Sequence, residues 1–298
     1  MSEKLTIVNG NDFLNNRFMK REFIIEPFFM TQGLMMIYAQ RGIGKTYFAM
    51  TLAAAMIQGI SLFDNRFKIS RKQKVLYIDG EMSGHDMQER FKSLSIPKEN
   101  LDNIRIFNPD LQAPLGVSPN LASTEGQELI NEDGQWADVI IVDNLSTLAR
   151  DVSENQSNSW DIVQSWALKL RSQGKSIIFI HHAGKNNTQR GTSRREDVLD
   201  TVIKLRRPAE YNSKEGARFE IHFEKSRGFV GEDAESFEVK LELNNGKTIW
   251  ICDKINSQES RRAEEIMQLY EDGISQRKIA EIVGTSLSKV NRVIQNNK

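Results

Sequence analysis

An apolar run leads through a glycine-containing turn into a second apolar run at residues 33–58, GLMMIYAQRGIGKTYFAMTLAAAMIQ. The first run, residues 34–39, is short and continuous, as in strands that are buried on both faces of a parallel sheet. The second, residues 46–58, has the length and composition of a buried helix. Between them, AQRGIGKT at residues 39–46 fits the Walker A pattern, with Ala at its first position. The sequence therefore predicts a strand, a phosphate-binding loop and a helix in succession.

The residue types of this loop suit phosphate binding. Small residues let backbone N–H groups wrap the phosphates, and the helix N-terminus adds the positive end of its dipole. Lys45 would bridge the β- and γ-phosphates, and Thr46 would hold Mg²⁺ through its hydroxyl. The alternative is a glycine-containing turn with an incidental lysine. The residues expected to bind the nucleotide are Ala39, Gln40, Arg41, Gly42, Ile43, Gly44, Lys45, Thr46 and Tyr47.

Carboxylates follow two further apolar runs. Residues 137–144, ADVIIVDN, end an apolar strand at Asp143, which is the Walker B pattern and predicts a second contact to Mg²⁺. Residues 74–81, KVLYIDGE, place Asp79 and Glu81 at alternate positions, so both side chains should point to the same side of that strand. Glu81 could orient and deprotonate an attacking water. The alternative for either carboxylate is that it caps the next helix.

Composition excludes several classes of protein. The chain has 298 residues with 40 Lys and Arg against 40 Asp and Glu, so bulk charge does not favour a protein that coats nucleic acid. The single cysteine, Cys252, rules out an intrachain disulfide scaffold and favours a reducing compartment. The longest apolar stretch, residues 48–57, is shorter than the roughly 20 residues of a membrane span. The N-terminus lacks the features of a signal peptide, so we expect a cytoplasmic protein.

The chain divides by pattern into three parts. Apolar runs at residues 34–39, 74–81, 103–108, 138–144 and 176–182 alternate with helical patterns at 46–58, 85–94, 124–130 and 159–173. This alternation predicts an α/β fold with a mostly parallel sheet. After Arg207, residues 217–226, 236–243 and 248–254 resemble antiparallel strands at one edge of that sheet. We expect an N-terminal segment (1–30), a P-loop domain (31–255) and a C-terminal domain of three short helices (256–298).

Taken together, these segments resemble the RecA-fold ATPases. The likeness is carried by residues 33–53, 74–94, 137–148 and 176–185, with RGTS at 190–193, and covers roughly residues 33–243. Within that group it is similar to the hexameric helicases of the plasmid RepA and DnaB types. The resemblance implies a RecA-like P-loop NTPase core, ATP and Mg²⁺ as ligands, and a homo-oligomeric ring of six subunits.

The resemblance also implies roles for individual residues. In that group a glutamate on the second strand activates water, and Glu81 occupies the matching place. A Gln or His at the end of the strand SIIFI senses the γ-phosphate, and His182 is our choice for that position. The neighbouring His181 should point the other way and pack.

The segment at residues 223–231, FEKSRGFVG, resembles an element whose lysine and arginine reach into the nucleotide site of a neighbouring subunit. Lys225 and Arg227 would then act in trans, with Arg227 as an arginine finger. Arg206 and Arg207 compete for that role, and the alternative for Arg227 is an exposed charge on a strand. Replicative helicases of the DnaB type carry a substantial N-terminal domain that these first thirty or so residues do not match, which favours the RepA-like arrangement.

Two segments are candidates for contact with single-stranded DNA, at residues 147–158 and 184–195. A polar loop that carries cations can follow a phosphate backbone without reading bases. The alternatives are a solvated loop and a contact between subunits. The second segment carries Lys185, Arg190, Arg194 and Arg195.

The C-terminal 38 residues resemble a helix-turn-helix of the resolvase or sigma-factor kind. Ser275 would cap the second helix, Gly284 would form the turn, and residues 286–295 would be the recognition helix. The alternative is a bundle that binds protein, because the preceding helix is acidic. The residues expected to face duplex DNA are Ser286, Ser288, Lys289 and Arg292.

The leading hypothesis is an ATP-driven motor on single-stranded DNA, a RepA-like ring helicase that replicates a mobile element or phage. Two other hypotheses stay open. One is a DNA-bound regulator or initiator that ATP switches, with specificity from the C-terminal helices. The other is a recombination mediator that forms filaments.

Overall fold

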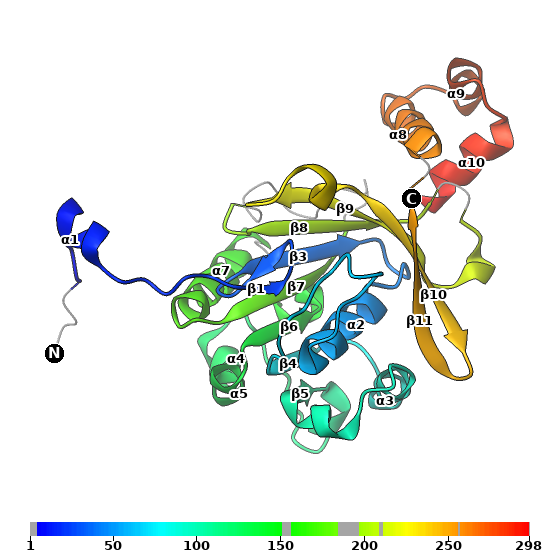
Figure 1. Ribbon diagram of the computed structural model, residues 1–298. Coiled ribbons are helices and arrows are strands. Elements are labelled where there is room, and N and C mark those ends of the chain that lie inside the picture. The colour runs from blue at the N-terminus through cyan, green and yellow to red at the C-terminus, as the bar shows by residue number, and fades with distance from the viewer. Residues whose placement is uncertain (1–4, 151–155, 184–196, 209–210, 256, 298) are drawn as a thin grey trace.

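The computed structural model describes residues 5–150, 156–183, 197–208, 211–255 and 257–297. Its central feature is a nine-stranded sheet with the order β11-β10-β9-β8-β3-β7-β6-β4-β5 (Figure 1). A separate two-stranded sheet pairs β1 (Phe23–Ile25) with β2 (Phe29–Met30). Among the described residues, no helix is both long and apolar enough to cross a membrane.

Six parallel strands make up the larger part of the sheet. They are β3 (Leu34–Ala39), β4 (Val75–Asp79), β5 (Ile104–Phe107), β6 (Val139–Asp143), β7 (Ser176–His182) and β8 (Thr201–Arg206). Ala39 pairs with His182, and Asp79 pairs with Asp143. The carboxyl ends of four neighbouring strands therefore lie at one edge of the sheet. Because the strands run in the same direction, the loops that follow them lie together at that edge.

Three antiparallel strands extend the sheet beyond β8, as the alternating pattern predicts. They are β9 (Arg218–Ser226), β10 (Phe237–Asn244) and β11 (Lys247–Lys254). The turn between β10 and β11 is Asn245-Gly246, and both residues have positive φ angles, of 51° and 75°. Such angles are typical of the two-residue turns that match the twist of a hairpin.

Helices cover both faces of the sheet and bury two cores. One core lies between the sheet and α2 (Lys45–Gln58), and includes Met87 of α3 (Gly84–Ser93). The other lies under α6 (Leu145–Leu148) and α7 (Gln156–Ser172). Because the parallel strands are covered on both sides, their sequences are continuously apolar rather than alternating.

Three expectations need correction. β5 is the outermost strand and exposes Arg105 and Ile106, so it is not buried on both faces. The single helix expected at residues 124–130 is instead α4 (Thr124–Glu128), followed by α5 (Asn131–Trp136) after an irregular Ile130. The sequence analysis did not predict strand β8. Its sequence, TVIKLR, has charged residues near its end, so it lacks the continuous apolar run of the other parallel strands, and the antiparallel strands follow it in the chain.

The C-terminal residues form three helices, as predicted, around a small core of their own. These are α8 (Ser257–Glu271), α9 (Gln276–Val283) and α10 (Leu287–Asn296). Gly284 ends α9 in the left-handed conformation, and the Ser286 hydroxyl accepts a hydrogen bond from Lys289 N at 3.2 Å. Ser275 stands at the N-cap of α9 but its side chain makes no capping hydrogen bond, so that part of the expectation is wrong. A domain boundary at residue 256 stays a prediction.

Candidate nucleotide site

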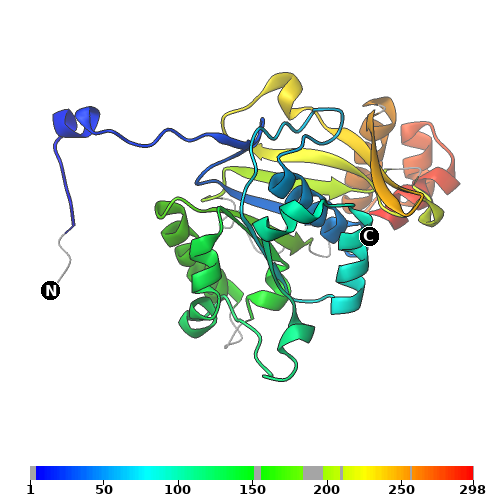
Figure 2. The same cartoon turned by 60° about the horizontal axis from the view of Figure 1, so that its bottom comes forward.

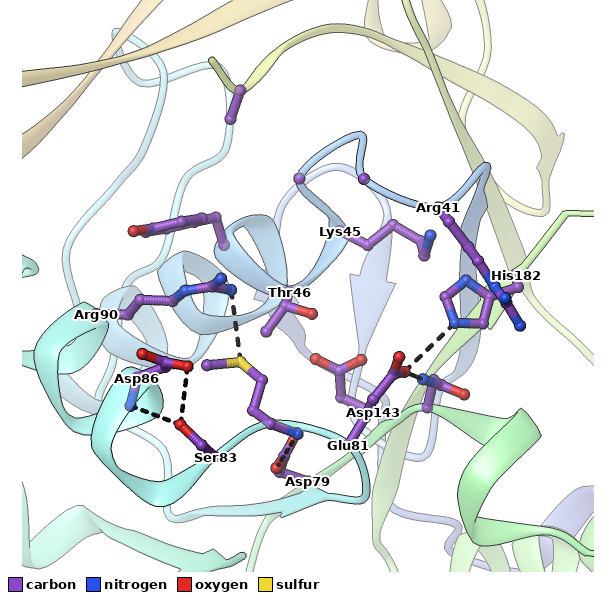
Figure 3. A pocket seen from close by; sticks show the side chains of 16 residues that line it. Arg41, Lys45, Thr46, Asp79, Glu81, Ser83, Asp86, Arg90, Asp143 and His182 are labelled. Carbon is purple, nitrogen blue, oxygen red and sulfur yellow. Dashed lines mark hydrogen bonds and ion pairs between the residues drawn. The ribbon is translucent and has the colours of Figure 1, made fainter. Parts of the chain in front are cut away.

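A cavity of about 550 Å³ opens at the carboxyl ends of β3, β4, β6 and β7 (Figure 3). It therefore lies at the edge of the sheet where ligands of open parallel sheets bind. Residues from the phosphate-binding loop, from the turn after β4 and from the ends of β6 and β7 surround it. They are Arg41, Gly42, Gly44, Lys45, Thr46, Tyr47, Asp79, Glu81, Met82, Ser83, Asp86, Arg90, Asp143, Asn144, His182 and Ala217.

The loop has the backbone of a phosphate cradle. Gly42 and Gly44 have φ angles of +75° and +115°, which L-residues rarely adopt. A Cβ on Gly44 would also lie only 3.0 Å from Ala217 Cβ and 3.2 Å from the Phe219 ring. Gly44 is the N-cap of α2 and offers no side-chain cap, so the first N–H groups of this helix suit an anionic ligand.

Lys45 is buried and folds back over its own loop. Its Nζ donates to the carbonyl oxygens of Ala39, at 3.0 Å, and Gln40, at 2.6 Å. Burial lowers the pKa of Lys45 to about 8, and the nearby carboxylates of Asp143 and Glu81 oppose this shift in part. With a phosphate in the cavity, Lys45 Nζ could exchange these carbonyl acceptors for a negatively charged oxygen, which binds an ammonium group more strongly. The position of Lys45 therefore fits a phosphate ligand.

Asp143 fits a site that receives a cation. Its carboxylate is buried at the end of β6, where it accepts hydrogen bonds from the Tyr77 hydroxyl, at 2.7 Å, and from the Thr46 side chain. Burial raises the pKa of Asp143, so its negative charge is poorly solvated. Thr46 and Asp143 together offer the hydroxyl and carboxylate oxygens that Mg²⁺ prefers, as the sequence predicts.

Glu81 lies at the mouth of the cavity between two polar neighbours. Asn144 Nδ2 donates to Glu81 Oε2 at 2.6 Å, and His182 Nε2 lies 3.5 Å from the same oxygen. Asn144 is itself fixed, because its Oδ1 accepts from Ser146 N at the start of α6. Burial, and then the charge of Lys45, lower the pKa of His182 and so favour its neutral form. The arrangement orients a carboxylate whose side chain is still 57% exposed to water.

Asp79 has a different environment from Glu81. The two residues were expected on one strand, but β4 ends at Asp79 and Glu81 lies in the following turn; both line the cavity. Asp79 Oδ2 accepts from Met82 N, at 3.0 Å, and from Asn108 Nδ2, at 2.9 Å. Burial and the neighbouring Asp143 raise the pKa of Asp79 to about 7. Asp79 therefore holds the turn that carries Glu81, while Ser83 caps α3.

Some lining residues escape sequence reasoning. Arg90 of α3 places its guanidinium 4.5 Å from the centre of the Tyr47 ring and donates to Met82 Sδ at 3.4 Å. Neither Asn144 nor Arg90 is a defining residue of the motifs discussed above. The sequence could have pointed to them only because the helices that they cap or belong to, α6 and α3, follow β6 and β4 directly. Conversely, Ala39 and Ile43 are buried and Gln40 does not line the cavity, so these three expected binding residues contribute through the backbone or the core.

The three candidate arginine fingers have separate surroundings. Arg206 forms ion pairs with Glu220, at 2.8 Å, and with Glu264 of α8, at 3.2 Å. Arg207 donates to the Gly42 carbonyl at 3.2 Å, beside the loop of its own chain. Arg227 donates to the Asp197 carbonyl at 3.0 Å, near the amino end of β8. The cavity lies at the carboxyl ends of the parallel strands, so Arg227 is at the opposite end of the sheet. Lys225 pairs with Val202 at that same end.

The expected nucleic-acid residues divide between two places. Lys185, Arg190, Arg194 and Arg195 lie outside the described residues. Ser286 caps α10, which also carries Ser288, Lys289 and Arg292, and of these four only Lys289 is partly buried. His181 is buried, as expected, on the face opposite His182.

Comparisons with known proteins agree with this architecture. A model of the AAA_25 family, described as an AAA domain, matches residues 3–188. No curated protein matches the chain in sequence. A KaiC-like protein from the archaeon Pyrococcus horikoshii OT3 is 15% identical, with a TM-score of 0.48 over 76% of this chain and 93% of that one. The flagellar accessory protein FlaH from Methanocaldococcus jannaschii is also 15% identical, with a TM-score of 0.50 over 74% and 89%. At this identity the likeness to FlaH concerns the α/β fold alone, which it confirms.

Proposed function

The chain belongs to the AAA_25 family of AAA domains, and we propose that it is an ATP-hydrolysing motor that acts on single-stranded DNA. Family and fold together support a RecA-like P-loop ATPase. The finer proposal is a RepA-like ring helicase in the replication of a mobile element or phage. The observation that carries the enzymatic part is the grouping of Lys45, Glu81 and Asp143 around one cavity.

Each residue has a task in hydrolysis. Lys45 and the first turn of α2 would bind the phosphates, and Thr46 and Asp143 would hold Mg²⁺, which supplies positive charge to the phosphate oxygens. Glu81, oriented by Asn144, would accept a proton from the attacking water. The neutral imidazole of His182 lies beside Glu81 and at the end of β7, so it could report the state of the site to the chain that follows β7.

Support for a DNA substrate comes from the sequence. The segment that follows β7 carries Lys185, Arg190, Arg194 and Arg195 before its first acidic residue, Glu196. A cationic segment can bind the phosphates of a single strand, and because it follows β7 directly in the sequence, its hold on DNA could change with the nucleotide. Arg227 would complete the site from a neighbouring subunit of a homo-oligomeric, hexameric ring, since it lies across the sheet from the cavity of its own chain.

ATP hydrolysis with and without single-stranded DNA, over protein concentrations that span assembly, tests this proposal. We expect strong stimulation by single strands, and no hydrolysis by Lys45→Ala at any concentration. Lys185→Ala/Arg190→Ala/Arg194→Ala should hydrolyse ATP at the unstimulated rate, with little response to DNA. Stimulation by duplex DNA alone would contradict the motor, and turnover by Lys45→Ala would contradict the nucleotide site.

A second candidate function is an ATP-switched regulator that binds duplex DNA through its C-terminal helices. One set of contacts favours it. Arg207 donates to the Gly42 carbonyl of the phosphate-binding loop, and its guanidinium lies 4.5 Å from the centre of the Tyr211 ring. The Tyr211 carbonyl in turn accepts from Asn296 Nδ2 of α10, at 3.3 Å. A change in the loop on nucleotide binding could therefore move α10.

Duplex binding measured with and without a non-hydrolysed ATP analogue separates the two functions. The regulator requires affinity for duplex DNA that changes with the nucleotide and that Arg292→Ala weakens. Asn296→Ala, which removes the hydrogen bond from α10 to the Tyr211 carbonyl, should uncouple affinity from nucleotide. If duplex DNA binds weakly, and with the same affinity with and without the nucleotide, the result would contradict the regulator and favour the single-strand motor.

A further inference from the structure

Two arginines line the nucleotide cavity, and their surroundings differ. Arg90 is held in place, because its guanidinium lies 4.5 Å from the centre of the Tyr47 ring and donates to Met82 Sδ at 3.4 Å. Arg41 is exposed and, among the residues that the structure describes, has no hydrogen-bond or ion-pair partner for its side chain. A ligand in the cavity can therefore recruit the Arg41 guanidinium without breaking an existing contact.

Arg41 lies at the end of the cavity where hydrolysis would take place. In Figure 3 its side chain extends from the phosphate-binding loop toward His182, with Lys45 between it and Arg90 in that view. His182 Nε2 is itself 3.5 Å from Glu81 Oε2. Burial is the main cause of the lowered pKa of Lys45 and of His182, and the charge of Arg41 lowers the pKa of both further. The guanidinium is thus within electrostatic reach of the lysine and of the histidine beside the proposed base.

The backbone that carries Arg41 is held on both sides. The Gln40 carbonyl before it accepts from Lys45 Nζ at 2.6 Å, and the Gly42 carbonyl after it accepts from an Arg207 guanidinium nitrogen at 3.2 Å. The side chain of Arg41 therefore starts from a fixed point of the loop while its guanidinium stays available. Such an arrangement limits the conformational entropy that a bound phosphate group has to overcome.

The other candidate arginines are less suited to the nucleotide of their own chain. Arg206 pairs with the buried Glu220 and with Glu264 of α8. The C-terminal helices lie beside the antiparallel strands in both views (Figures 1 and 2). Moving Arg206 to a phosphate would take the guanidinium away from a buried carboxylate, which is costly. Arg227 lies at the amino end of β8, opposite the cavity.

We propose that Arg41 stabilises the transferring γ-phosphoryl group of ATP from within the same chain. A water oxygen bonds to the γ-phosphorus while Glu81 takes a proton from that water. The bond from the γ-phosphorus to the β–γ bridging oxygen breaks, and the electron pair leaves with ADP. Negative charge spreads over the γ-phosphoryl oxygens in this step, and the Arg41 guanidinium donates its N–H groups to them.

The inference rests on the proposed ATPase activity and assigns a catalytic residue to it. Because Arg41 belongs to the same chain as the phosphate-binding loop, its contribution does not require a neighbouring subunit. An arginine in trans, such as Arg227, adds positive charge only in an assembly. The assignment therefore predicts that isolated subunits hydrolyse ATP, and that this activity depends on Arg41.

Single-turnover hydrolysis of ATP by the full chain, without DNA and at concentrations where sedimentation velocity shows monomers, tests the assignment. We expect a wild-type rate constant that does not change with protein concentration in this range. Arg41→Ala should lower it by about 10³-fold or more, with ATP affinity changed less than about tenfold. Arg41→Lys keeps the charge but not the planar fork, so its rate should lie between the two. Arg277→Ala, at an exposed position of α9, is the matched control and should hydrolyse as wild type does.

Binding of ADP with aluminium fluoride gives a second readout, which does not need turnover. The fluoride complex takes the place of the transferring phosphoryl group, so it reports on the groups that stabilise the transition state. Monomeric wild type should bind a fluorescent ADP at least about tenfold more tightly when aluminium fluoride is present. Arg41→Ala should bind ADP but show no such gain. Circular dichroism confirms that the variants are folded.

The outcomes separate this inference from the proposed function. Equal rate constants and equal fluoride effects in wild type and Arg41→Ala would overturn the role of Arg41 and leave the ATPase standing. Turnover by wild type only at concentrations where it assembles would also overturn it, in favour of an arginine in trans. A wild type that hydrolyses no ATP at any concentration would contradict both the inference and the ATPase.

Discussion

Glu81 and His182 face each other at the mouth of the cavity, with Glu81 Oε2 3.5 Å from His182 Nε2 and 2.6 Å from Asn144 Nδ2. The three residues lie at the carboxyl ends of three adjacent strands: Glu81 and Asn144 just after β4 and β6, and His182 as the last residue of β7. A carboxylate held on one oxygen by a fixed amide keeps its other oxygen for water. This is the geometry that a general base for hydrolysis needs.

Replacing Glu81 by Gln should separate binding from hydrolysis. The Gln side chain keeps the shape and can still accept from Asn144, but it cannot take a proton from water. We expect ATP turnover to fall by about 10²- to 10⁴-fold while nucleotide affinity changes little. Steady-state turnover and binding of a fluorescent ATP analogue measure the two quantities. Glu89→Gln, at an exposed position of α3, is the control, and a loss of turnover below tenfold in Glu81→Gln would assign the base elsewhere.

Nucleotide affinity should fall above about pH 8. Burial lowers the pKa of Lys45 to about 8, so in the empty site this side chain loses its proton as the pH rises through that value. The charged form attracts phosphate, and binding must then take up a proton. We expect the dissociation constant to rise by up to about tenfold per pH unit between pH 8 and 9.5. Titration calorimetry measures it, and Lys45→Met should bind weakly without this slope. Parallel slopes in both proteins would contradict the assignment.

Asp79 should make the protein less stable as the pH rises. Its folded-state pKa of about 7 lies above the value near 3.9 of an unfolded chain, so the native state holds the proton more tightly. That contribution to stability is complete below about pH 4 and is lost as the pH rises through 7. Asp79→Asn keeps an acceptor for Met82 N and Asn108 but does not titrate.

The free energy of unfolding of Asp79→Asn, relative to wild type, should therefore increase between pH 5 and pH 8. We expect an increase on the order of 1–3 kcal/mol, measured by urea denaturation without nucleotide. Asp102→Asn, at an exposed position, should follow wild type. A difference between Asp79→Asn and wild type that is the same at both pH values would show that Asp79 is ionised throughout.

Mixtures of inactive subunits should distinguish the arginines. If Arg227 acts in trans, Glu81→Gln mixed with Arg227→Ala regains part of the ATPase activity, since some boundaries join an intact cavity to an intact Arg227. Arg207 lies beside the loop of its own chain, so Glu81→Gln mixed with Arg207→Ala should regain none. The opposite pattern, with activity restored only by the Arg207 mixture, would make Arg207 the residue that crosses the subunit boundary.

Local sequence was sufficient for the central strands of the parallel sheet and for the loop chemistry. The apolar runs at residues 34–39 and 176–182 are β3 and β7 to the residue, because a strand buried on both faces has to be apolar throughout. Gly42 and Gly44 supply the backbone that the phosphate-binding loop requires, and that property belongs to the residues themselves. Asp143 was predicted near the loop from the Walker B pattern, and Glu81 and His182 from the resemblance to RecA-fold ATPases; the structure brings the three together because parallel strands end at a common edge.

Only the tertiary structure determined which strands are neighbours and how deeply each titratable group is buried. The order β7-β6-β4 brings Asn144, which follows β6, within hydrogen-bonding distance of Glu81, and no sequence motif predicts that contact. The same order makes β5 an exposed edge with a groove beside it. The altered pKa values of Lys45 and Asp79 arise from burial by residues distant in sequence. Desolvation is a property of the packed chain, so it has no counterpart in a local pattern of residues.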